Sequence, residues 1–306
     1  MQSKKSMRAR RLLEGANIGD FIFDTAIYIV VTICVFLCLA PFVYIISLSF
    51  SSVRAINSRE VFLWPVEFDL LNYIKVLNDP MMVKSLYNSV VVTVAHTALA
   101  MVMTILCAYP LTKSRLKGRK FLTTMIIFTM LFSGGLIPDY LLIKNLGLTN
   151  NLLSLIIPGC LATMNMIILR TFFVNSIPAG IEEAAMVDGC NDFIILVRVV
   201  LPLSMPVLAT LSLFYAVGRW NGFQDAKFYI SKQEMYTLPQ KINAVINSNR
   251  LSTQTLLQEG DLKDQIATSE GLKAASIVFT TLPILIVYPW LQKYFVSGVM
   301  IGAIKG

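Results

Sequence analysis

Of the 306 residues of the chain, 56% are hydrophobic and 14% are charged, and the mean hydropathy is +0.67. Because a soluble protein has about 25% charged residues, this composition excludes a soluble globular domain and predicts an integral membrane protein. The net charge of +8 does not by itself indicate a nucleic-acid partner, since Lys and Arg of membrane proteins gather in cytoplasmic segments. The five cysteines lie mostly in apolar runs without metal-ligand spacing, which favours buried small side chains over disulfides or a metal site.

Six apolar segments follow a basic N-terminal arm, residues 1–22. A helix of about 20 apolar residues crosses the hydrocarbon core of a bilayer, where an unpaired backbone amide would find no partner. The first segment is too long for the hydrophobic part of a cleavable signal peptide, so we expect it to be retained. The predicted spans are 23–50, 85–112, 121–143, 152–173, 207–223, which Gly218 interrupts, and 274–296.

Basic residues predict the orientation of these spans. The arm 1–22 and the connection "KSRLKGRK", residues 113–120, carry a strong excess of Lys and Arg and are predicted to be cytoplasmic. An even number of spans then places both termini in the cytoplasm. The longer segments 51–84 and 225–273 have balanced charges, and we expect the second of them to be extracytoplasmic.

A polar stretch, "IEEAAMVDGCNDFIILVRVVLPLSMP", separates the fourth and fifth spans on the cytoplasmic side. Its first helix has a proline at the start, acids in its early turns and a glycine that can end it in a left-handed conformation. Asn or Asp can cap a second short helix, which two prolines end or kink. These residues are Pro178, Glu182, Glu183, Gly189, Asn191, Asp192, Pro202 and Pro206. The pattern predicts a helical hairpin over 178–206 or, equally, an amphipathic loop lying on the membrane.

One motif within this stretch is specific. Glu183-Ala184-Ala185 is followed after three residues by Gly189, after nine more by Val199, and one residue further on by Leu201-Pro202. This spacing resembles the EAA loop of ABC importer permeases. Val199 stands where that family usually has Ile, and Asp188 matches the Asp that precedes the family's glycine.

Other stretches resemble carbohydrate permeases similar to the smaller permease of the maltose system. They are "YNSVVVTV" (87–94), "AYPLTKSRLKGRK" (108–120) and "RWNGF" (219–223), in which Arg219 is unusual. Residues 131–151 and 292–306 are similar to the LplC/YtcP-like branch, whose substrates are complex oligosaccharides. The resemblance covers nearly the whole chain.

The resemblance implies an all-α membrane protein with six transmembrane helices and the type I ABC importer permease fold, its N and C termini and its EAA coupling-helix hairpin cytoplasmic. One permease domain would cover 23–299, followed by a cytoplasmic tail, 300–306. Such a subunit of the bacterial cell membrane is not an enzyme; it translocates an oligosaccharide by alternating access. ATP and Mg would bind two separate ATPase subunits, and this sequence has no GxxxxGK[ST] phosphate loop. A second permease subunit, an extracytoplasmic binding lipoprotein and membrane lipid complete the expected partners, without nucleic acid or metal.

The resemblance also implies roles for individual hairpin residues. Glu183 would make the main polar contact, to an Arg of the ATPase, and Asp188 would brace the loop internally. The complete predicted coupling set is Glu182, Glu183, Ala184, Ala185, Asp188, Gly189, Leu201 and Pro202. From the hydrophobic pattern, Ala184, Ala185, Val187, Phe193 and Leu196 are expected to form a docking face. The tail 300–306 would reach towards the ATPases or fray as a terminus.

The substrate path is assigned to Trp220, Asn221 and Asn165, because interrupted helices tend to line transport paths. His96 is expected instead to make a hydrogen bond between helices. Segment 225–273 is too polar to span a membrane, and it is expected either to contact the binding protein or to be a mobile surface loop.

Three alternatives remain on these grounds. A permease for a non-sugar solute would carry the same loop. A self-contained secondary transporter would show inverted repeats or intramembrane carboxylates, whereas the span interiors lack Asp and Glu. A membrane enzyme would need a catalytic set, and the chain offers one His, scattered cysteines and no clustered acids.

Overall fold

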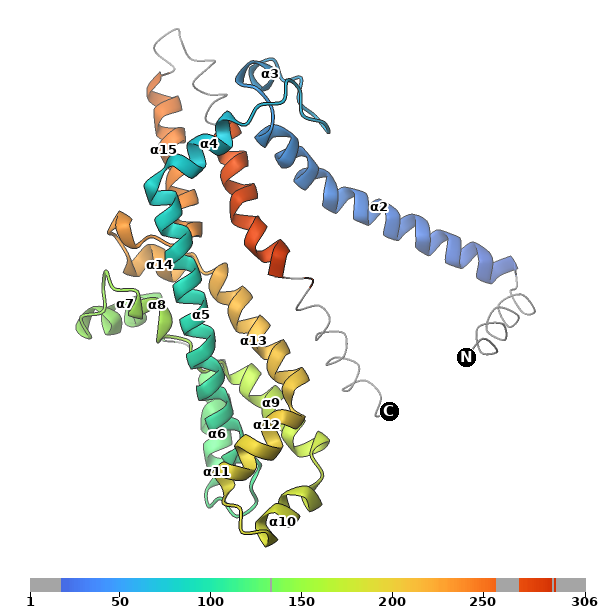
Figure 1. Cartoon of the computed structure of the whole chain (residues 1–306), viewed down its shortest axis with the longest axis vertical. Coiled ribbons are helices and arrows are strands. Elements are labelled where there is room, and N and C mark those ends of the chain that lie inside the picture. The colour runs from blue at the N-terminus through green and yellow to red at the C-terminus, as the bar shows by residue number, and fades with distance from the viewer. Residues whose placement is uncertain (1–17, 133, 257–269, 288, 290–306) are drawn as a thin grey trace. The chain divides into compact units, whose positions relative to one another are not determined.

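The computed structural model describes residues 18–132, 134–256, 270–287 and 289, and these are mostly helical, which confirms the all-α prediction (Figure 1). By length and composition alone, three described helices could cross a membrane: Phe21–Ser49, Pro80–Thr112 and Glu270–Val287. The number rises to six if each of three bent helix pairs is one span. Most of the basic arm, residues 257–269 and the tail 300–306 lie outside the described residues.

The chain divides into two compact units, of which the first comprises residues up to 73 and 259–275. Its main element is α2 (Ile18–Ser49), and no residue in the most apolar 18-residue window of this helix is buried. α3 (Val53–Asn57) follows α2 and begins at Ser52, whose hydroxyl accepts the N–H of Ala55. The apolar surface of α2 therefore requires lipid or another protein chain around it.

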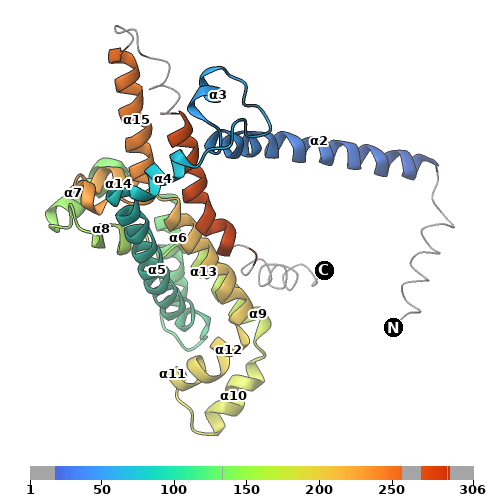
Figure 2. The ribbon, with the colours of Figure 1, turned by 45° about the horizontal axis from the view of Figure 1, so that its top comes forward.

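The second unit is built on α5 (Pro80–Ala108), the teal helix of Figures 1 and 2. α5 begins where the carboxylate of Asp79 accepts the N–H of Met81 at 2.9 Å, with Pro80 in the first turn. It packs along α13 (Met205–Trp220) and α9 (Thr163–Ser176). The other elements are α4 (Leu71–Asn78), which straddles the boundary between the units, the 3₁₀ turns Pro110–Thr112 and Gln233–Met235, α14 (Gln224–Tyr229) and α15 (Leu238–Leu256).

Two predicted spans are interrupted, so their prediction as continuous helices is wrong. α6 (Arg119–Leu131) and α7 (Leu136–Asn145) meet at an angle of 111°, next to Gly135 with φ of +90°. α8 (Leu153–Ile156) ends before Pro158 and Gly159, and α9 starts only at Thr163. A left-handed glycine and a proline break the ladder of helical hydrogen bonds even where the sequence stays apolar.

The fifth and sixth predicted spans differ at their ends. α13 continues without interruption through Gly218 to Trp220. The predicted interruption at Gly218 is therefore wrong. The last described helix begins at Glu270, four residues before the predicted start, and residues 290–296 lie outside the described part. Segment 225–256 is ordered into α14, a 3₁₀ turn and α15 rather than being a structureless loop.

Candidate functional site: the hairpin between α9 and α13

The first helix of the hairpin, α10, covers Ala179–Val187 and ends as predicted. Gly189 has φ of +82°, and its N–H donates to the carbonyl of Met186 at 3.0 Å. The N–H of Cys190 reaches back to the carbonyl of Ala185, also at 3.0 Å. These bonds satisfy carbonyl groups that the helix end leaves free, and the left-handed conformation explains why glycine occupies this position.

The second half of the hairpin contains three short helical pieces. The side chain of Asn191 accepts the N–H of Ile194 at 2.9 Å, so Asn191 rather than Asp192 is the cap. α11 (Asp192–Ile195) continues into a π-helical turn (Leu196–Val200) and α12 (Leu201–Leu203), and α13 then leaves at 84°. Pro202 and Pro206 lie in the first turns of α12 and α13, so these prolines begin helices instead of ending one.

Two ion pairs brace the hairpin from the basic connection after α5. Lys113 pairs with Glu182, and these side chains are only 13% and 19% exposed. Arg115 pairs with Asp192, and these side chains are 57% and 50% exposed. The ammonium of Lys113 also lies 4.2 Å from the ring centroid of Tyr109. Sequence reasoning used the basic connection only to orient the spans and missed these contacts, although clustered cations and acids in two segments predicted to share one side were the available signal.

Hydrophobic packing completes the base of the hairpin. Ile195, Leu196 and Val200 are buried in one cluster with residues from α5, α9 and α13. Ala185 and Leu201 pack against that cluster from the hairpin. Two of the five residues of the predicted docking face, Ala185 and Leu196, therefore face inward, because they are needed for this internal core.

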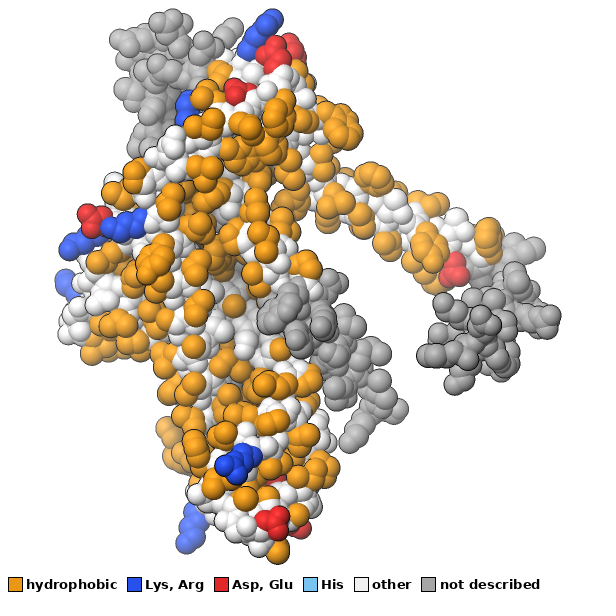
Figure 3. All heavy atoms as spheres, viewed as in Figure 1, with side chains coloured by type: hydrophobic (Ala, Val, Ile, Leu, Met, Phe, Trp, Pro, Cys, Tyr) orange, Lys and Arg blue, Asp and Glu red, His pale blue; other side chains and the backbone are white. Residues whose placement is uncertain are grey.

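A different set of hairpin side chains remains on the surface. Glu183 is exposed, and its carboxylate makes no hydrogen bond or ion pair with the residues that the structure describes. Val187 is 87% exposed, and Phe193 is exposed as well. Figure 3 shows acidic side chains among hydrophobic ones at the end of the molecule formed by α10 and α11. Exposed apolar groups beside a free carboxylate, on a rigid base, can dock onto a complementary cationic surface of another protein.

Four further predicted coupling residues are exposed as well: Ala184, Asp188, Gly189 and Pro202. Asp188 ends α10 through its backbone N–H, which donates to the carbonyl of Ala184 at 3.0 Å. Its carboxylate has no described partner, so the internal brace expected of Asp188 is provided by Glu182 and Asp192 instead.

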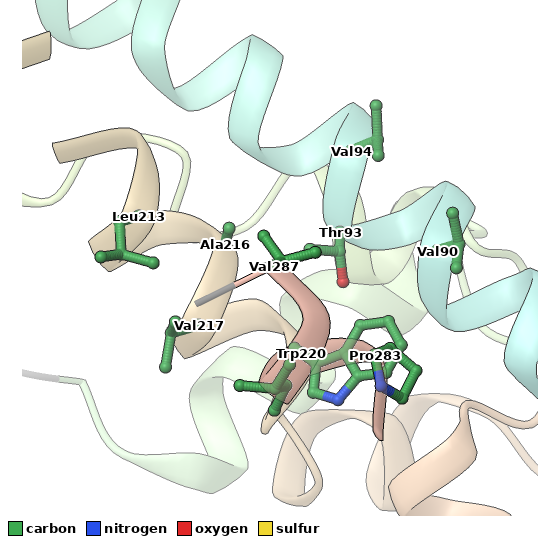
Figure 4. A pocket seen from close by; sticks show the side chains of 10 residues that line it. Val90, Thr93, Val94, Leu213, Ala216, Val217, Trp220, Pro283 and Val287 are labelled. Carbon is green, nitrogen blue, oxygen red and sulfur yellow. The ribbon is translucent and has the colours of Figure 1, made fainter. Parts of the chain in front are cut away.

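An apolar cavity of about 300 Å³ lies between α5, α13 and the helix Glu270–Val287 (Figure 4). Trp220 lines it and is 8% exposed, and its indole N–H has no hydrogen-bond partner among the described residues. Asn221 is exposed and donates to the carbonyl of Val217 at 2.9 Å. Asn165 is half-buried on α9. Of the three predicted path residues, only Trp220 lines this cavity.

Polar side chains within the spans satisfy the backbone at the break between α8 and α9. Nδ1 of His96 lies 2.8 Å from the carbonyl oxygen of Ile156, in agreement with the hydrogen bond expected for His96. Arg219 donates to the carbonyl of Leu155 at 3.1 Å, and the hydroxyl of Tyr215 accepts the N–H of Ala162 at 3.1 Å. Backbone groups in a non-helical membrane segment need such partners, so these residues make the interruption possible.

Arg219, unusual by sequence, is also an ion-pair partner. Its side chain is 8% exposed, and Nη2 lies 2.6 Å from Oδ2 of Asp225 at the start of α14. A Cβ on Gly222 would lie 2.9 Å from Cζ of Arg219 and closer still to Nη2. Gly222 therefore leaves room for the guanidinium, which joins α13, α8 and α14.

The part of segment 225–273 that the structure describes is anchored to α5. Asn88 donates to the carbonyls of Glu234 and Tyr236 at 3.0 and 3.1 Å. Asp79 pairs with Lys241 at 2.9 Å. Partial burial works to raise the pKa of Asp79, but the hydrogen bond and charge of Lys241 and the backbone N–H groups of α5 outweigh it and lower the pKa below its ordinary value. Residues 234–241 are thus held against the N-terminal part of α5.

Comparison with known proteins places these features in context. Residues 16–301 match the family described as binding-protein-dependent transport system inner membrane component. Protein LplC of Bacillus subtilis is 41% identical over 87% of this chain and 89% of its own length. The polygalacturonan/rhamnogalacturonan transport system permease protein YtcP of Bacillus subtilis is 38% identical over 93% of this chain and 99% of its own length. A chain from the crystal structure of a bacterial ABC transporter involved in import of the acidic polysaccharide alginate aligns with a TM-score of 0.81 at 34% identity, covering 92% of this chain and 99% of that one.

Proposed function

Because the chain belongs to the family of binding-protein-dependent transport system inner membrane components, it is a multi-pass permease subunit of the cell membrane, and we propose that its cargo is a complex oligosaccharide. The relatives named for polygalacturonan/rhamnogalacturonan and for alginate support this substrate class. Members of this family are non-catalytic membrane components that bind no cofactor themselves. The energy for transport must therefore come from other subunits.

The proposed topology has six spans with both termini in the cytoplasm. The proposed spans are α2, α5, the segment from α6 into α7, the segment from α8 into α9, α13 and the helix that begins at Glu270. Contacts at the two ends of α5 support this arrangement. At its C-terminal end, the basic connection meets the hairpin through Lys113 and Arg115, so two segments assigned to the cytoplasm lie together. At its N-terminal end, Asp79 pairs with Lys241 of the segment assigned to the outer side.

The hairpin 178–206 is the proposed coupling element to an ATPase. The observation that carries this proposal is the division of its acids: Glu182 and Asp192 are held by internal cations, whereas Glu183 is free on the surface beside exposed Val187. A coupling element needs a rigid base and a vacant contact surface, and this hairpin has both. A push on α10 would reach α13 directly, since the two are joined through α11 and α12 and share one buried cluster.

The complete importer would contain further subunits. We propose two ATPase subunits that carry ATP and Mg, a second permease subunit, and an extracytoplasmic binding lipoprotein that delivers the oligosaccharide. The family description, which names binding-protein dependence, supports the last of these. The exposed apolar surface of α2 suits contact with lipid and with the second permease. Segment 225–273 would face the binding protein, and the tail 300–306 the ATPases.

The coupling role can be tested in the assembled importer with Glu183→Lys. We expect this variant to lose oligosaccharide uptake and to retain less ATPase on co-purification, at an unchanged amount of permease in the membrane. Glu60→Lys, a charge reversal at an exposed acid outside the hairpin, is the matched control and should leave both properties intact. Normal uptake by the Glu183→Lys importer would refute the assignment.

A further inference from the structure

The non-helical segment between α8 and α9, residues 157–162, lies inside the proposed fourth span. The 14 residues of α9 rise by only about 21 Å from the cytoplasmic end, whereas the hydrocarbon core is about 30 Å thick. The segment is therefore still within the hydrocarbon core, towards its outer side. His96, which bonds to the carbonyl just before the segment, lies well inside the long helix α5, in agreement with this level.

The backbone of this segment carries hydrogen-bonding groups that the described residues do not use. The carbonyls of residues 158–161 accept no hydrogen bond within the part of the chain that the structure describes. Gly159 is exposed with φ of +73°, and a Cβ there would meet no atom within 4 Å beyond its chain neighbours. The space in front of this backbone is therefore open. Asn165, in the first turn of α9, is half-buried, and its amide has no partner among the described residues either.

Three buried polar side chains support the two edges of the segment. His96, Tyr215 and Arg219 are only 6%, 5% and 8% exposed, and each bonds to backbone at Leu155, Ile156 or Ala162. Burying such side chains costs free energy unless they are hydrogen-bonded, and a continuous helix would need none of them. The edges of the interruption are thus satisfied from within the chain, whereas its middle, residues 158–161, is left open to an outside partner.

Open, non-helical backbone does not face lipid, because nothing there pairs with its N–H and C=O groups; it is covered by protein or lines a water-filled space. We propose that residues 157–161 line the aqueous path of the glycan near its outer end, where their carbonyls accept hydrogen bonds from sugar hydroxyls. Neutral and acidic sugars both carry hydroxyl donors, so this lining suits the glycans named for both relatives. The inference rests on the proposed cargo and topology, and it adds the place of the path.

The apolar cavity at Trp220 is a poorer lining for such a path. Apart from Trp220 and Thr93 its lining side chains are aliphatic or proline, and the indole N–H and the Thr93 hydroxyl are buried in its walls. Val94 of α5 lines this cavity (Figure 4), whereas His96 of the same helix reaches α8. Because helical residues two apart point about 200° from each other, the cavity and the interruption lie on opposite faces of α5. The two can therefore be probed separately.

Cys160 lies in the segment and is a native probe for water. The other cysteines are replaced by Ala in the assembled importer, which is then treated with the anionic thiol reagent 2-sulfonatoethyl methanethiosulfonate; they are Cys34, Cys38, Cys107 and Cys190. The reagent does not enter lipid and reacts with the thiolate, which forms in water and is disfavoured in apolar surroundings. Val94→Cys combined with Cys160→Ala is the matched control, because Val94 is 63% exposed at a similar level and lines the apolar cavity. We expect Cys160 to be modified at least about tenfold faster than the control thiol.

Uptake links this reactivity to transport. In proteoliposomes, modification of Cys160 should block oligosaccharide uptake, and removal of the added group by dithiothreitol should restore it. Methyl methanethiosulfonate, which adds only a small S-methyl group, should inhibit less than the bulkier anionic reagent. The same treatments should leave uptake by the Val94→Cys control unchanged.

Three results would overturn the assignment. Equally slow modification of both thiols would mean that another protein chain covers the segment. Faster modification of Val94→Cys would move the path to the cavity at Trp220, and fast modification of Cys160 without loss of uptake would place its water outside the path. The proposed function fails separately: an untreated importer that takes up no oligosaccharide refutes the cargo, while the reactivity of Cys160 still tests the aqueous lining.

Discussion

The buried ion pair between Lys113 and Glu182 should hold the hairpin far more firmly than the exposed pair between Arg115 and Asp192. Lys113→Met keeps the apolar stem of the side chain but removes its charge, and leaves Glu182 four-fifths buried without a partner. Breaking a buried pair in this way costs about 3–5 kcal/mol. Since both side chains retain some exposure, we expect about 2–3 kcal/mol here. Arg115→Met removes an exposed pair, which is worth about 0.2–1 kcal/mol.

Hydrogen–deuterium exchange of segment 178–206 in the assembled importer measures this difference, because protected amides exchange through local opening. Lys113→Met should accelerate exchange in the hairpin about 30- to 150-fold, and Arg115→Met less than about 5-fold. The charge swap Lys113→Glu with Glu182→Lys should recover most of the protection, although the contact of Lys113 with the ring of Tyr109 is lost. Equal effects of the two single variants, or no recovery in the swap, would refute the assignment of Glu182 as the internal brace.

Three further predictions concern backbone and electrostatics. Gly222→Ala should displace the guanidinium of Arg219 and lower the free energy of unfolding by about 1–3 kcal/mol. In an Arg219→Ala background the same substitution should have little effect, and additive losses would contradict a steric overlap between the new Cβ and the guanidinium. Gly189→Ala should destabilise the hairpin by about 1–2 kcal/mol through its left-handed φ, and Gly189→Asn by less, as measured by exchange in α10; equal costs would contradict strain as the cause. Because the folded pKa of Asp79 is lowered, its pairing with Lys241 stabilises the fold above the ordinary Asp pKa, and this contribution is lost as pH falls through the lowered value. Protease resistance of segment 225–256 should fall over that acid range, and Lys241→Met should remove that dependence; an unchanged pH profile in this variant would argue against the pair.

Local rules were sufficient for the ends of the hairpin helices. The left-handed Gly189 and the cap of α11 depend only on neighbours within a few residues. Gly189 was predicted from the sequence, whereas the cap was predicted as Asn191 or Asp192, of which the structure has Asn191. The spacing from Glu183 to Pro202 was likewise enough to predict the family, which the comparison with known proteins confirms. Hydropathy also predicted the all-helical class, because composition alone decides whether a segment can enter lipid.

Interruptions of the spans could not be predicted in this way. Segments 121–143 and 152–173 are predominantly apolar, so hydropathy alone does not locate a break, although Gly134-Gly135 and Pro158-Gly159 stand at the two interruptions. The carbonyls of Leu155 and Ile156 are satisfied by Arg219 and His96, which lie about 60 residues away in the chain in opposite directions. Whether Gly and Pro break a membrane helix depends on such distant partners, and a single sequence does not show which side chains will reach the freed backbone groups.

Local rules also do not show which of the two adjacent acids of the hairpin faces inward. Glu182 and Glu183 are identical in chemistry, but successive helical residues point about 100° apart, so only one of them can face the base. The base is set by the connection that carries Lys113, and this connection is fixed by the end of α5. Docking at Glu183 would therefore press on a helix that is tied both to α5, through Lys113, and to α13, through the buried cluster around Ile195 and Leu211. α5 and α13 also line the cavity at Trp220. The ion pair of Glu182 with Lys113 therefore links the exposed surface around Glu183 to the interior of the permease.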